Sequence, residues 1–111
     1  MPIRLELPET FAARLSASER PLIGLWACAG SPITAEIVAG SGCDWVLLDA
    51  EHSPNGLESV LAQLHAMSAY PAAPLVRPAT GDPVLIKQYL DLGAQNLLIP
   101  MVDSSEQAAE V

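Results

Sequence analysis

The chain has 111 residues, of which 50% are hydrophobic and 16% are charged, and its net charge is −8. A chain this apolar is unlike a disordered segment, and one this acidic is a poor binder of nucleic acid or of an anionic membrane. Its five basic residues form no cluster, and no stretch approaches the roughly 20 apolar residues of a membrane span. The composition therefore predicts one globular domain without nucleic-acid or membrane partners.

The first 20 residues predict an extra helix, over about residues 8–16, that precedes the first strand. Charges occur throughout this segment, which lacks the apolar run of a secretory signal. Cys28 and Cys43 are the two cysteines of the chain. Two cysteines in such an apolar chain indicate small core residues of a reduced, cytoplasmic protein, and not a disulfide framework.

A first unit of strand, loop and helix follows. Residues 22–27 are apolar and predict a strand. Ser31 is a suitable N-cap, and Pro32 occupies the first helical position, where its missing N–H costs nothing. The predicted helix covers residues 33–39. The candidates for its left-handed end are Gly40 and Gly42.

The second unit begins with a strand over residues 44–49. It is almost continuously apolar, which is typical of a strand that is covered on both faces in a parallel sheet. Asn55 is the expected N-cap of the next helix, with Glu58 as its capping-box partner. The apolar residues of that helix recur at helical spacing: Leu57, Val60, Leu61, Leu64 and Met67.

Two further units are predicted. Residues 74–77 form a short third strand, a helix over residues 84–92 opens at Asp82 and stops at Gly93, and a fourth strand covers residues 96–101. The segment from 42 to 48 also matches the segment from 93 to 99 by residue type, with a glycine that feeds a buried strand in each.

This repeat predicts an α/β fold built as a parallel (β/α)₈, or TIM, barrel, of which the chain holds about the first four βα units. An eight-unit barrel has about 250 residues, or about 31 per unit. Ser104 and Gln107 open another helix just before the sequence stops. We therefore expect the N-terminal half of one barrel domain, with residues 1–20 as a helical segment and 21–111 as units 1–4. The alternative is a natural half-barrel that is completed by dimerisation.

The polar residues that follow the predicted strands are the candidate site, because active sites of parallel α/β folds lie at the carboxyl ends of the strands. The second strand ends at Asp49, followed by Glu51 and His52. A carboxylate near an imidazole prepares a general base. Arg77, the last residue of the third strand, is suited to hold a carboxylate or to stabilise an enolate oxygen, and also to pair with Asp49 or Glu51.

Trp26 ends the first strand, where it either forms a wall of the substrate pocket or packs under the loops. His65 and Lys87 fall within helices and are expected to be exposed to solvent. No lysine lies at a strand end, which argues against Schiff-base chemistry in this part of a barrel. Neither a glycine-rich phosphate loop nor a zinc-type spacing of Cys and His is present.

Several runs of the sequence resemble the HpcH/HpaI aldolase family, from about Phe11 to the end of the chain. The most specific of them is the run 44–55, Asp-Trp-Val-Leu-Leu-Asp-Ala-Glu-His-Ser-Pro-Asn, together with the later Val-Arg-Pro at 76–78. Further matching runs are 23–26, 31–32, 35–37, 86–88, 91–95 and 98–102.

The resemblance implies a barrel of the phosphoenolpyruvate/pyruvate-binding type and a class II aldolase, a carbon–carbon lyase. Such an enzyme cleaves a 4-hydroxy-2-oxo acid, such as 4-hydroxy-2-oxoheptanedioate, to pyruvate and an aldehyde, here succinate semialdehyde. It uses a divalent ion (magnesium, manganese or cobalt) and acts in aromatic compound catabolism. The resemblance also implies a homo-oligomer, a hexamer.

The same resemblance assigns roles to residues of this chain. His52 would be the acid/base group, with Asp49 as its dyad partner. Arg77 would bind the keto or enolate oxygen of pyruvate, beside Trp26. The metal ligands of the family, a Glu and an Asp, lie on later strands, beyond Val111. We therefore expect the 111-residue chain by itself to bind metal weakly and to lack aldolase activity.

Two alternatives remain at this stage. One is an aldolase of the same family that acts on 2-keto-3-deoxy acids derived from sugars, whereas a lyase for a coenzyme A thioester would need more basic residues. The other is a non-catalytic remnant, an inactive fragment or an assembly subunit. Against this second alternative, Asp49, His52 and Arg77 are all present.

Overall fold

The computed structural model describes residue 3 and residues 6–111. Residues 1–2 and 4–5 of the predicted N-terminal segment lie outside the described residues. The elements in chain order are α1 (Phe11–Ala17), β1 (Gly24–Ala27), α2 (Pro32–Ala39), β2 (Trp45–Asp49), α3 (Leu57–Met67), β3 (Ala73–Arg77), α4 (Pro83–Asp91) and α5 (Ser105–Glu110). The alternation of strands and helices that the sequence predicts is confirmed, with most boundaries within two residues.

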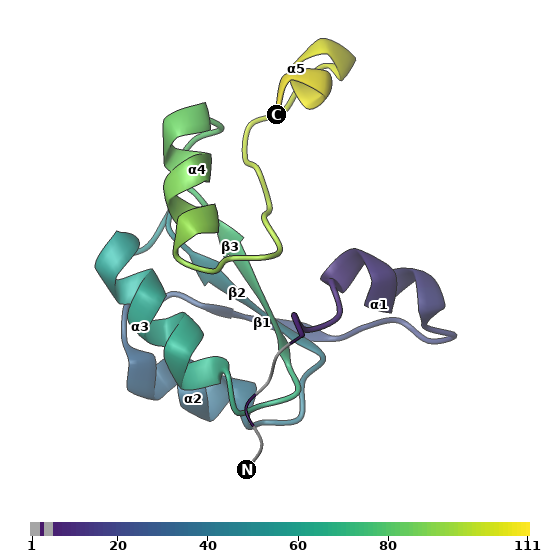
Figure 1. Cartoon of the computed structure of the whole chain (residues 1–111), viewed down its shortest axis with the longest axis vertical. Coiled ribbons are helices and arrows are strands. Elements are labelled where there is room, and N and C mark those ends of the chain that lie inside the picture. Colours follow the sequence, from purple (N-terminus) through teal and green to yellow (C-terminus); the bar gives the residue numbers. More distant parts are fainter. Residues whose placement is uncertain (1–2, 4–5) are drawn as a thin grey trace.

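The strands form one parallel sheet in the order β1-β2-β3. In Figure 1, α2, α3 and α4 lie along the sheet, whereas α1 lies apart from them and α5 projects away from the rest. Helix α2 contacts β1 and β2, and α3 contacts both α2 and β3. Sequential parallel strands joined by helices are the arrangement of the first units of a (β/α) barrel.

Both faces of the sheet are covered by apolar side chains. Val46, Leu48 and Val76 are fully buried in the cluster that lies under the helices. On the other face, Leu47 and Leu75 form a second cluster. Because alternate residues of a strand point to opposite faces, an uninterrupted apolar run is what a strand buried on both sides requires.

Helix α1 lies at the amino ends of β2 and β3. Arg14 Nη1 donates hydrogen bonds to the carbonyl oxygens of Asp44 (3.0 Å) and Pro71 (2.9 Å). The ring of Phe11 meets the ring of Trp45 edge-on, with 5.8 Å between the centroids. Helix α1 therefore covers the end of the sheet opposite to the end that carries Asp49.

The segment before β1 is tied to β2 by an ion pair. Arg20 donates two hydrogen bonds to the Asp44 carboxylate, at 2.6 and 2.9 Å, and the backbone N–H of Ile23 donates a third at 2.8 Å. The bond from Arg20, with that from Ile23, lowers the pKa of Asp44 to about 2. The Arg20 side chain is 63% exposed, so the pair positions the segment more than it stabilises the fold.

The predicted repeat of glycines is confirmed. Gly42 and Gly93 precede β2 and the segment at 96–98, and both adopt positive φ angles, of 94° and 100°. Gly40, the other candidate for the left-handed end of α2, has a φ of −82° and is the C-cap itself. A glycine with a positive φ therefore lies in both helix-to-strand turns, two residues after the C-cap of α2 (Gly42) and one residue after that of α4 (Gly93).

The predicted fourth strand at 96–101 is wrong in extent. Only a single bridge forms there, between Val76 and Leu97. Two backbone hydrogen bonds accompany it, Val76 N–H to the Asn96 carbonyl (2.9 Å) and Leu98 N–H to the Val76 carbonyl (2.9 Å). Beyond these two bonds, the backbone of residues 99–101 pairs with no other strand among the described residues. Met101 adopts a positive φ of 57°. Apolar residues alone do not make a strand where no neighbour pairs with the backbone.

The cysteines depart in part from the expectation. Both are free, as predicted, and Cys43 is half-buried against the main core. Cys28, in contrast, is exposed in the loop after β1 and is not a core residue.

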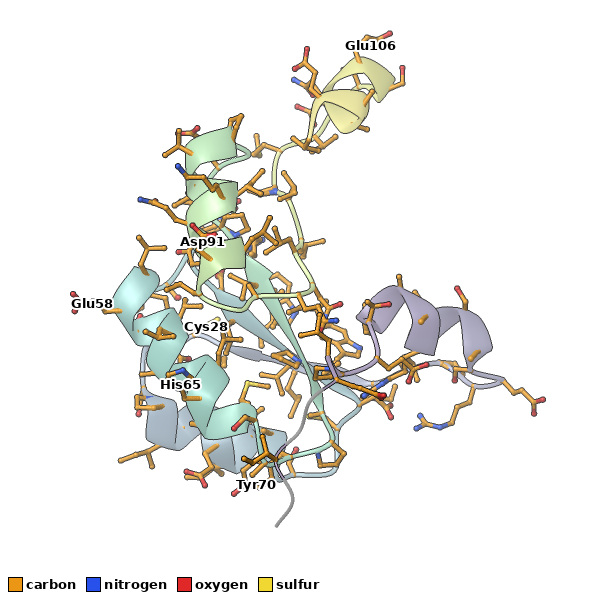
Figure 2. All side chains as sticks on the ribbon, in the orientation of Figure 1. Cys28, Glu58, His65, Tyr70, Asp91 and Glu106 are labelled. Atoms are coloured by element: carbon orange, nitrogen blue, oxygen red, sulfur yellow. The ribbon has the colours of Figure 1, made fainter. Side chains whose placement is uncertain are left out.

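His65 and Lys87 are exposed, as predicted. Figure 2 shows Glu58 on the outer surface of α3, directed away from the sheet. None of the helices in the described part of the chain is long and apolar enough to cross a membrane.

Gly24 is required by the ring of its neighbour in the sheet. A Cβ atom at this position would lie 1.9 Å from Trp45 Cδ2, and Gly24 pairs with Trp45 in the register. We expect Gly24→Ala to lower the free energy of unfolding by about 1–3 kcal/mol, because the ring must leave its place. Urea unfolding measures the change. The same substitution beside Trp45→Leu should cost clearly less, and equal costs in the two backgrounds would contradict the steric explanation.

Candidate active site

Three of the predicted site residues come from the carboxyl ends of neighbouring strands. Trp26 belongs to β1, Asp49 ends β2 and Arg77 ends β3. The register pairs Asp49 directly with Arg77, and it pairs Trp26 with Leu47, two residues before Asp49. Because paired residues share a face of the sheet, all three side chains lie on the face opposite to the helices.

Asp49 and Arg77 form a buried, bidentate ion pair. Arg77 Nε donates to Asp49 Oδ1 at 2.9 Å, and Arg77 Nη2 donates to Oδ2 at 3.0 Å. The two side chains are 16% and 2% exposed, for Arg77 and Asp49 respectively. This fork-to-fork geometry fixes the plane of the guanidinium as well as its position.

Trp26 holds the same guanidinium from another side. The Arg77 Cζ atom lies 4.4 Å from the centroid of a Trp26 ring, within the range of a cation–π contact. Trp26 is 47% exposed. The ring stacks on the arginine and remains partly open to solvent, and its role as a wall of the substrate pocket stays a prediction.

The charges of the pair are secured by their mutual contact. The hydrogen bond from Arg77 lowers the pKa of the Asp49 carboxyl, and the backbone N–H groups of Glu51 and His52 lower it further, against the opposing effect of burial. The hydrogen bond to Asp49 in turn raises the pKa of Arg77. Asp49 is therefore an anion at neutral pH, and Arg77 is a cation whose orientation is set by the sheet.

The loop after β2 is closed on the carbonyl oxygen of Asp49. That oxygen accepts hydrogen bonds from the Ser53 hydroxyl and from Asn55 Nδ2, the latter at 2.7 Å. Asn55 Oδ1 accepts from Ser59 Oγ at 3.0 Å and from Gln63 Nε2 at 2.7 Å. The Asn55 amide thereby joins the loop to α3, which leaves the intervening residues 50–54 little freedom.

The prediction that Asn55 caps α3 is wrong, because these hydrogen bonds already occupy the Asn55 amide. The N-cap is Gly56, whose N–H donates to Ser59 Oγ at 2.9 Å. Glu58 lies in the first turn of the helix without a part in the capping. The Asn55 side chain is bound to the loop, to Ser59 Oγ and to Gln63, so it does not accept from the backbone N–H groups of the first turn of α3.

Glu51 and His52 lie side by side in this loop. His52 Nε2 is 2.6 Å from Glu51 Oε1, and the same oxygen is 3.7 Å from Arg77 Nη1. The imidazole is 74% exposed, whereas the Glu51 side chain is 13% exposed. The end of the sheet thus presents an accessible imidazole, a fixed guanidinium and two carboxylates in one place, a combination suited to general acid–base catalysis beside a developing oxyanion.

Comparison with known proteins now bears on the site. A sequence profile of the HpcH/HpaI aldolase/citrate lyase family matches residues 22–111, which include all the residues of the candidate site. The chain belongs to the HpcH/HpaI aldolase/citrate lyase family. The resemblance found in the sequence is confirmed by this match.

Curated relatives carry the names of aldolases. A hydroxypyruvate/pyruvate aldolase of Deinococcus radiodurans is 57% identical over 99% of this chain. A 4-hydroxy-2-oxo-heptane-1,7-dioate aldolase of Escherichia coli is 50% identical over 94% of it. The chain spans about 40% of the length of these relatives, so what it shares with them concerns one part of the enzyme.

A solved family member supports the fold. The HpcH/HpaI aldolase/citrate lyase family protein of Burkholderia cenocepacia superposes with a TM-score of 0.83 at 41% identity, over 86% of this chain and 38% of that protein. The three parallel strands and their helices therefore correspond to part of the family's barrel, and the prediction of the barrel class is confirmed.

The family resemblance implies that Asp49 is the partner of the His52 side chain, but the contacts are arranged differently. Asp49 Oδ2 accepts from the backbone N–H of His52 at 3.3 Å, whereas the imidazole contacts Glu51. From the sequence, Glu51 was expected as a residue that follows the second strand and as a candidate partner of Arg77, but not as a partner of the His52 side chain. The available signal for its contact with the imidazole was its position directly before His52 in the sequence. The catalytic roles of His52 and Arg77 remain predictions.

The two carboxylates do not fit a metal site. Among the described residues there is no group of three or more His, Cys, Asp or Glu side chains that could hold a metal ion. Asp49 is paired with Arg77, and Glu51 faces both Arg77 and His52. The assignment of metal ligands of the family to positions beyond Val111 remains a prediction.

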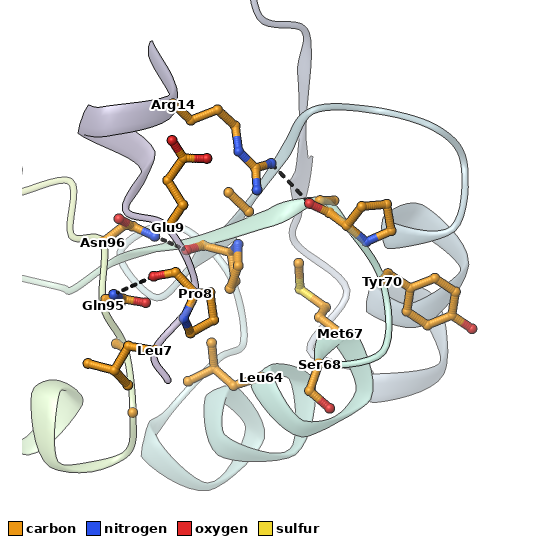
Figure 3. A pocket seen from close by; sticks show the side chains of 16 residues that line it. Leu7, Pro8, Glu9, Arg14, Leu64, Met67, Ser68, Tyr70, Gln95 and Asn96 are labelled. Carbon is orange, nitrogen blue, oxygen red and sulfur yellow. Dashed lines mark hydrogen bonds between the residues drawn. The ribbon is translucent and has the colours of Figure 1, made fainter. Parts of the chain in front are cut away.

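A cavity of about 530 Å³ lies at the other end of the molecule. It is bordered by residues 7–9 before α1, by the end of α3 and by residues 93–96 after α4 (Figure 3). Its charged side chains include Arg14, which is occupied by backbone carbonyl groups. Since active sites of (β/α) barrel enzymes lie at the carboxyl ends of their strands, the Asp49 end remains the candidate active site.

Proposed function

We propose that the complete protein to which this chain belongs is a carbon–carbon lyase that cleaves a 4-hydroxy-2-oxo acid to pyruvate and an aldehyde. The observation that carries the proposal is the fixed guanidinium of Arg77 beside the exposed imidazole of His52, at the carboxyl end of a parallel sheet. Membership of an aldolase family supports it.

The cleavage requires a base near the C4 hydroxyl and a positive charge near the C2 oxygen. His52 takes the proton of the C4 hydroxyl, the C3–C4 bond breaks, and the carbonyl of the aldehyde forms at C4. The electron pair of the broken bond moves through C3 to the C2 oxygen and gives an enolate. C3 then takes the proton back and pyruvate results, so that one hydroxy acid yields one pyruvate and one aldehyde.

Arg77 supplies the positive charge for the enolate oxygen. Its Nε and Nη2 atoms are bound to Asp49, whereas Nη1 lies 3.7 Å from Glu51 Oε1, farther than a hydrogen bond. The N–H groups of Nη1 therefore remain for a substrate oxygen. A guanidinium already held in place needs no reorganisation when the charge develops, which is the condition for strong stabilisation.

A divalent ion, which the family resemblance implies, would supply Lewis-acid polarisation of the 2-oxo group when bound. The described residues do not contain its ligand set, so no step above depends on it. We propose that the ligands belong to the remaining part of the complete protein.

The name of the relative in Deinococcus radiodurans favours a second donor. That protein is called a hydroxypyruvate/pyruvate aldolase. Hydroxypyruvate and pyruvate share the carboxylate and keto group that Arg77 would address, so we propose that both serve as donors in the condensation direction. We propose that loops outside the described contacts select the aldehyde.

The test is an assay of the complete protein. After metal removal with a chelator, we expect no pyruvate from 4-hydroxy-2-oxoheptanedioate, and we expect added magnesium, manganese or cobalt to restore its release, measured with lactate dehydrogenase and NADH. The 111-residue chain under the same conditions should release none. Absence of pyruvate from the metal-loaded complete protein would refute the proposal, and release by the short chain would refute the expected division of the site.

A further inference from the structure

The two sides of the candidate site are held by different means. Arg77 is paired with Asp49, and both are strand residues. His52 lies in the loop between β2 and α3, and its side chain is 74% exposed, so packing against the core does not fix the imidazole. The place of the imidazole therefore depends on the backbone of the loop, which the bonds of Ser53 and Asn55 to the Asp49 carbonyl oxygen hold.

The side-chain amide of Asn55 uses all of its hydrogen-bonding positions. Nδ2 donates to the carbonyl oxygen of Asp49 (2.7 Å) and to Ser53 Oγ (2.9 Å). Oδ1 accepts from Ser59 Oγ (3.0 Å) and from Gln63 Nε2 (2.7 Å). A side-chain amide has two donor hydrogens and one oxygen with two lone pairs. The amide thus joins the end of β2 to α3 through four bonds.

Gln63 and the Asp49 carbonyl decide which way round this amide lies. A serine hydroxyl both donates and accepts, so Ser53 and Ser59 tolerate either orientation of the amide. The Asp49 carbonyl only accepts, and Gln63 Nε2 only donates. The orientation of Gln63 is set in turn by the carbonyl oxygen of Ser59, to which Nε2 donates at 2.9 Å. The chain of bonds therefore runs in one direction, from α3 to the last residue of β2.

The stability of the fold does not account for a glutamine at position 63. Gln63 is 0% exposed, and its Oε1 atom has no hydrogen-bond partner among the described residues. A buried polar atom without a partner is costly, and an apolar side chain of the same shape avoids that cost. Asn55 Oδ1 would still accept from Ser59 Oγ in that case. The amide of Gln63 therefore points to a task other than packing.

We infer that Gln63 is a positioning residue for the reaction: through the Asn55 amide it fixes the path of residues 50–54, and so the distance of the His52 imidazole from Arg77. Gln63 itself is a buried residue of α3 and acts only through Asn55. A displacement of about 1 Å in a reacting group costs up to about 100-fold in rate, so a distant amide that holds the loop has a large effect. The inference rests on the proposed role of His52 as the base.

The experiment replaces Gln63 by methionine in the complete, metal-loaded protein. Gln63→Met keeps the length and bulk of the side chain and removes the donor to Asn55. We expect kcat for cleavage of the hydroxy-oxo acid to fall by about 10- to 100-fold. KM should be nearly unchanged, because Arg77 keeps its partner Asp49. Tm should change by no more than about 4 °C, because the substitution also removes the buried oxygen without a partner.

A double-mutant cycle tests whether Gln63 acts through Asn55. Asn55→Ala should lower kcat at least as much as Gln63→Met does. Gln63→Met in the Asn55→Ala background should lower kcat by less than about 2-fold further, because the bond between the two side chains is already absent. Losses that multiply in the double variant would show that the two residues act independently, and this result would overturn the inference.

Hydrogen exchange provides a readout that does not depend on activity. In Gln63→Met, the peptide that covers residues 50–55 should exchange about 10-fold faster than in the parent, because the loop opens more often when its link to α3 is weakened. Exchange at the parental rate would mean that Gln63 does not hold the loop, and the inference would fail.

A matched control and the His52 variant separate the remaining outcomes. Gln88→Met, on the exposed surface of α4, should leave kcat, KM and exchange unchanged. A parental kcat in Gln63→Met would overturn the inference, and so would a loss of kcat with a fall in Tm of about 10 °C or more, because the role would then be structural. If His52→Ala retains full activity, the proposed function fails and the inference with it. If His52→Ala is inactive while Gln63→Met is fully active, the inference alone fails.

Discussion

Replacement of His52 by alanine in the complete protein is expected to lower kcat for cleavage of 4-hydroxy-2-oxoheptanedioate by about 100- to 10,000-fold. General acid–base catalysis by a positioned side chain contributes about this much, and the imidazole is the accessible base beside Arg77 in the described site. KM should change little, because the guanidinium that addresses the 2-oxo group is bound to Asp49 and not to His52. Steady-state pyruvate release measures both constants.

The second histidine of the chain provides the matched control. His65 lies exposed on α3, and His65→Ala should retain the parental kcat and KM. Turnover by the His52→Ala variant at the parental rate would show that another group takes the proton.

Replacement of Asp49 by alanine is expected to lower the free energy of unfolding by about 3–5 kcal/mol, because it leaves the mostly buried cation of Arg77 without its partner. The Asp49 side chain is 2% exposed and accepts from both Arg77 and the loop backbone. Urea unfolding of the complete protein measures the loss. Asp91→Ala, at the exposed end of α4, is the control and should lie within about 0.5 kcal/mol of the parent.

The same ion pair predicts how stability depends on pH. The bond from Arg77 lowers the pKa of Asp49 in the folded state, so the unfolded chain binds a proton more readily. Its stabilisation is therefore fully present above the unfolded value of about 3.9, and it is lost as the pH falls through the lower, folded value. The parent should lose stability more steeply than Asp49→Ala below about pH 4. Parallel losses would show that the carboxylate is not the anionic partner of Arg77.

Much of the fold followed from local signals in the sequence. The pairs Ser31-Pro32 and Asp82-Pro83 predicted two helix starts, and in each the Ser or Asp side chain accepts from the first turn. The apolar run over residues 44–49 predicted a strand that is buried on both faces, and the buried side chains of β2 agree. These features depend on residues close together in the chain, so no long-range information was needed.

Other features depended on which strands pair, or on which groups compete for one hydrogen-bonding side chain, and a sequence pattern does not reveal either. The apolar segment over residues 96–101 forms one bridge, because a strand requires hydrogen-bond partners and it finds few within the described residues. Asn55 has the residue type of an N-cap, but its amide is already bound to Ser53 and Gln63. In both cases the residue type permits several structures, and the partners present in space select one.

The sequence by itself determined the class of fold, the family and the residues that gather at the active end of the sheet: Trp26, Asp49, Glu51, His52 and Arg77. Each could be found because it lies at or just after the end of a predicted strand, and parallel strands bring their carboxyl ends to one edge. Only the tertiary structure decided which side chain pairs with which. The register places Arg77 against Asp49 and fills that carboxylate, so the imidazole of His52 contacts Glu51. The physical reason is that a carboxylate has few acceptor positions, and their occupation depends on groups that lie far apart in the chain.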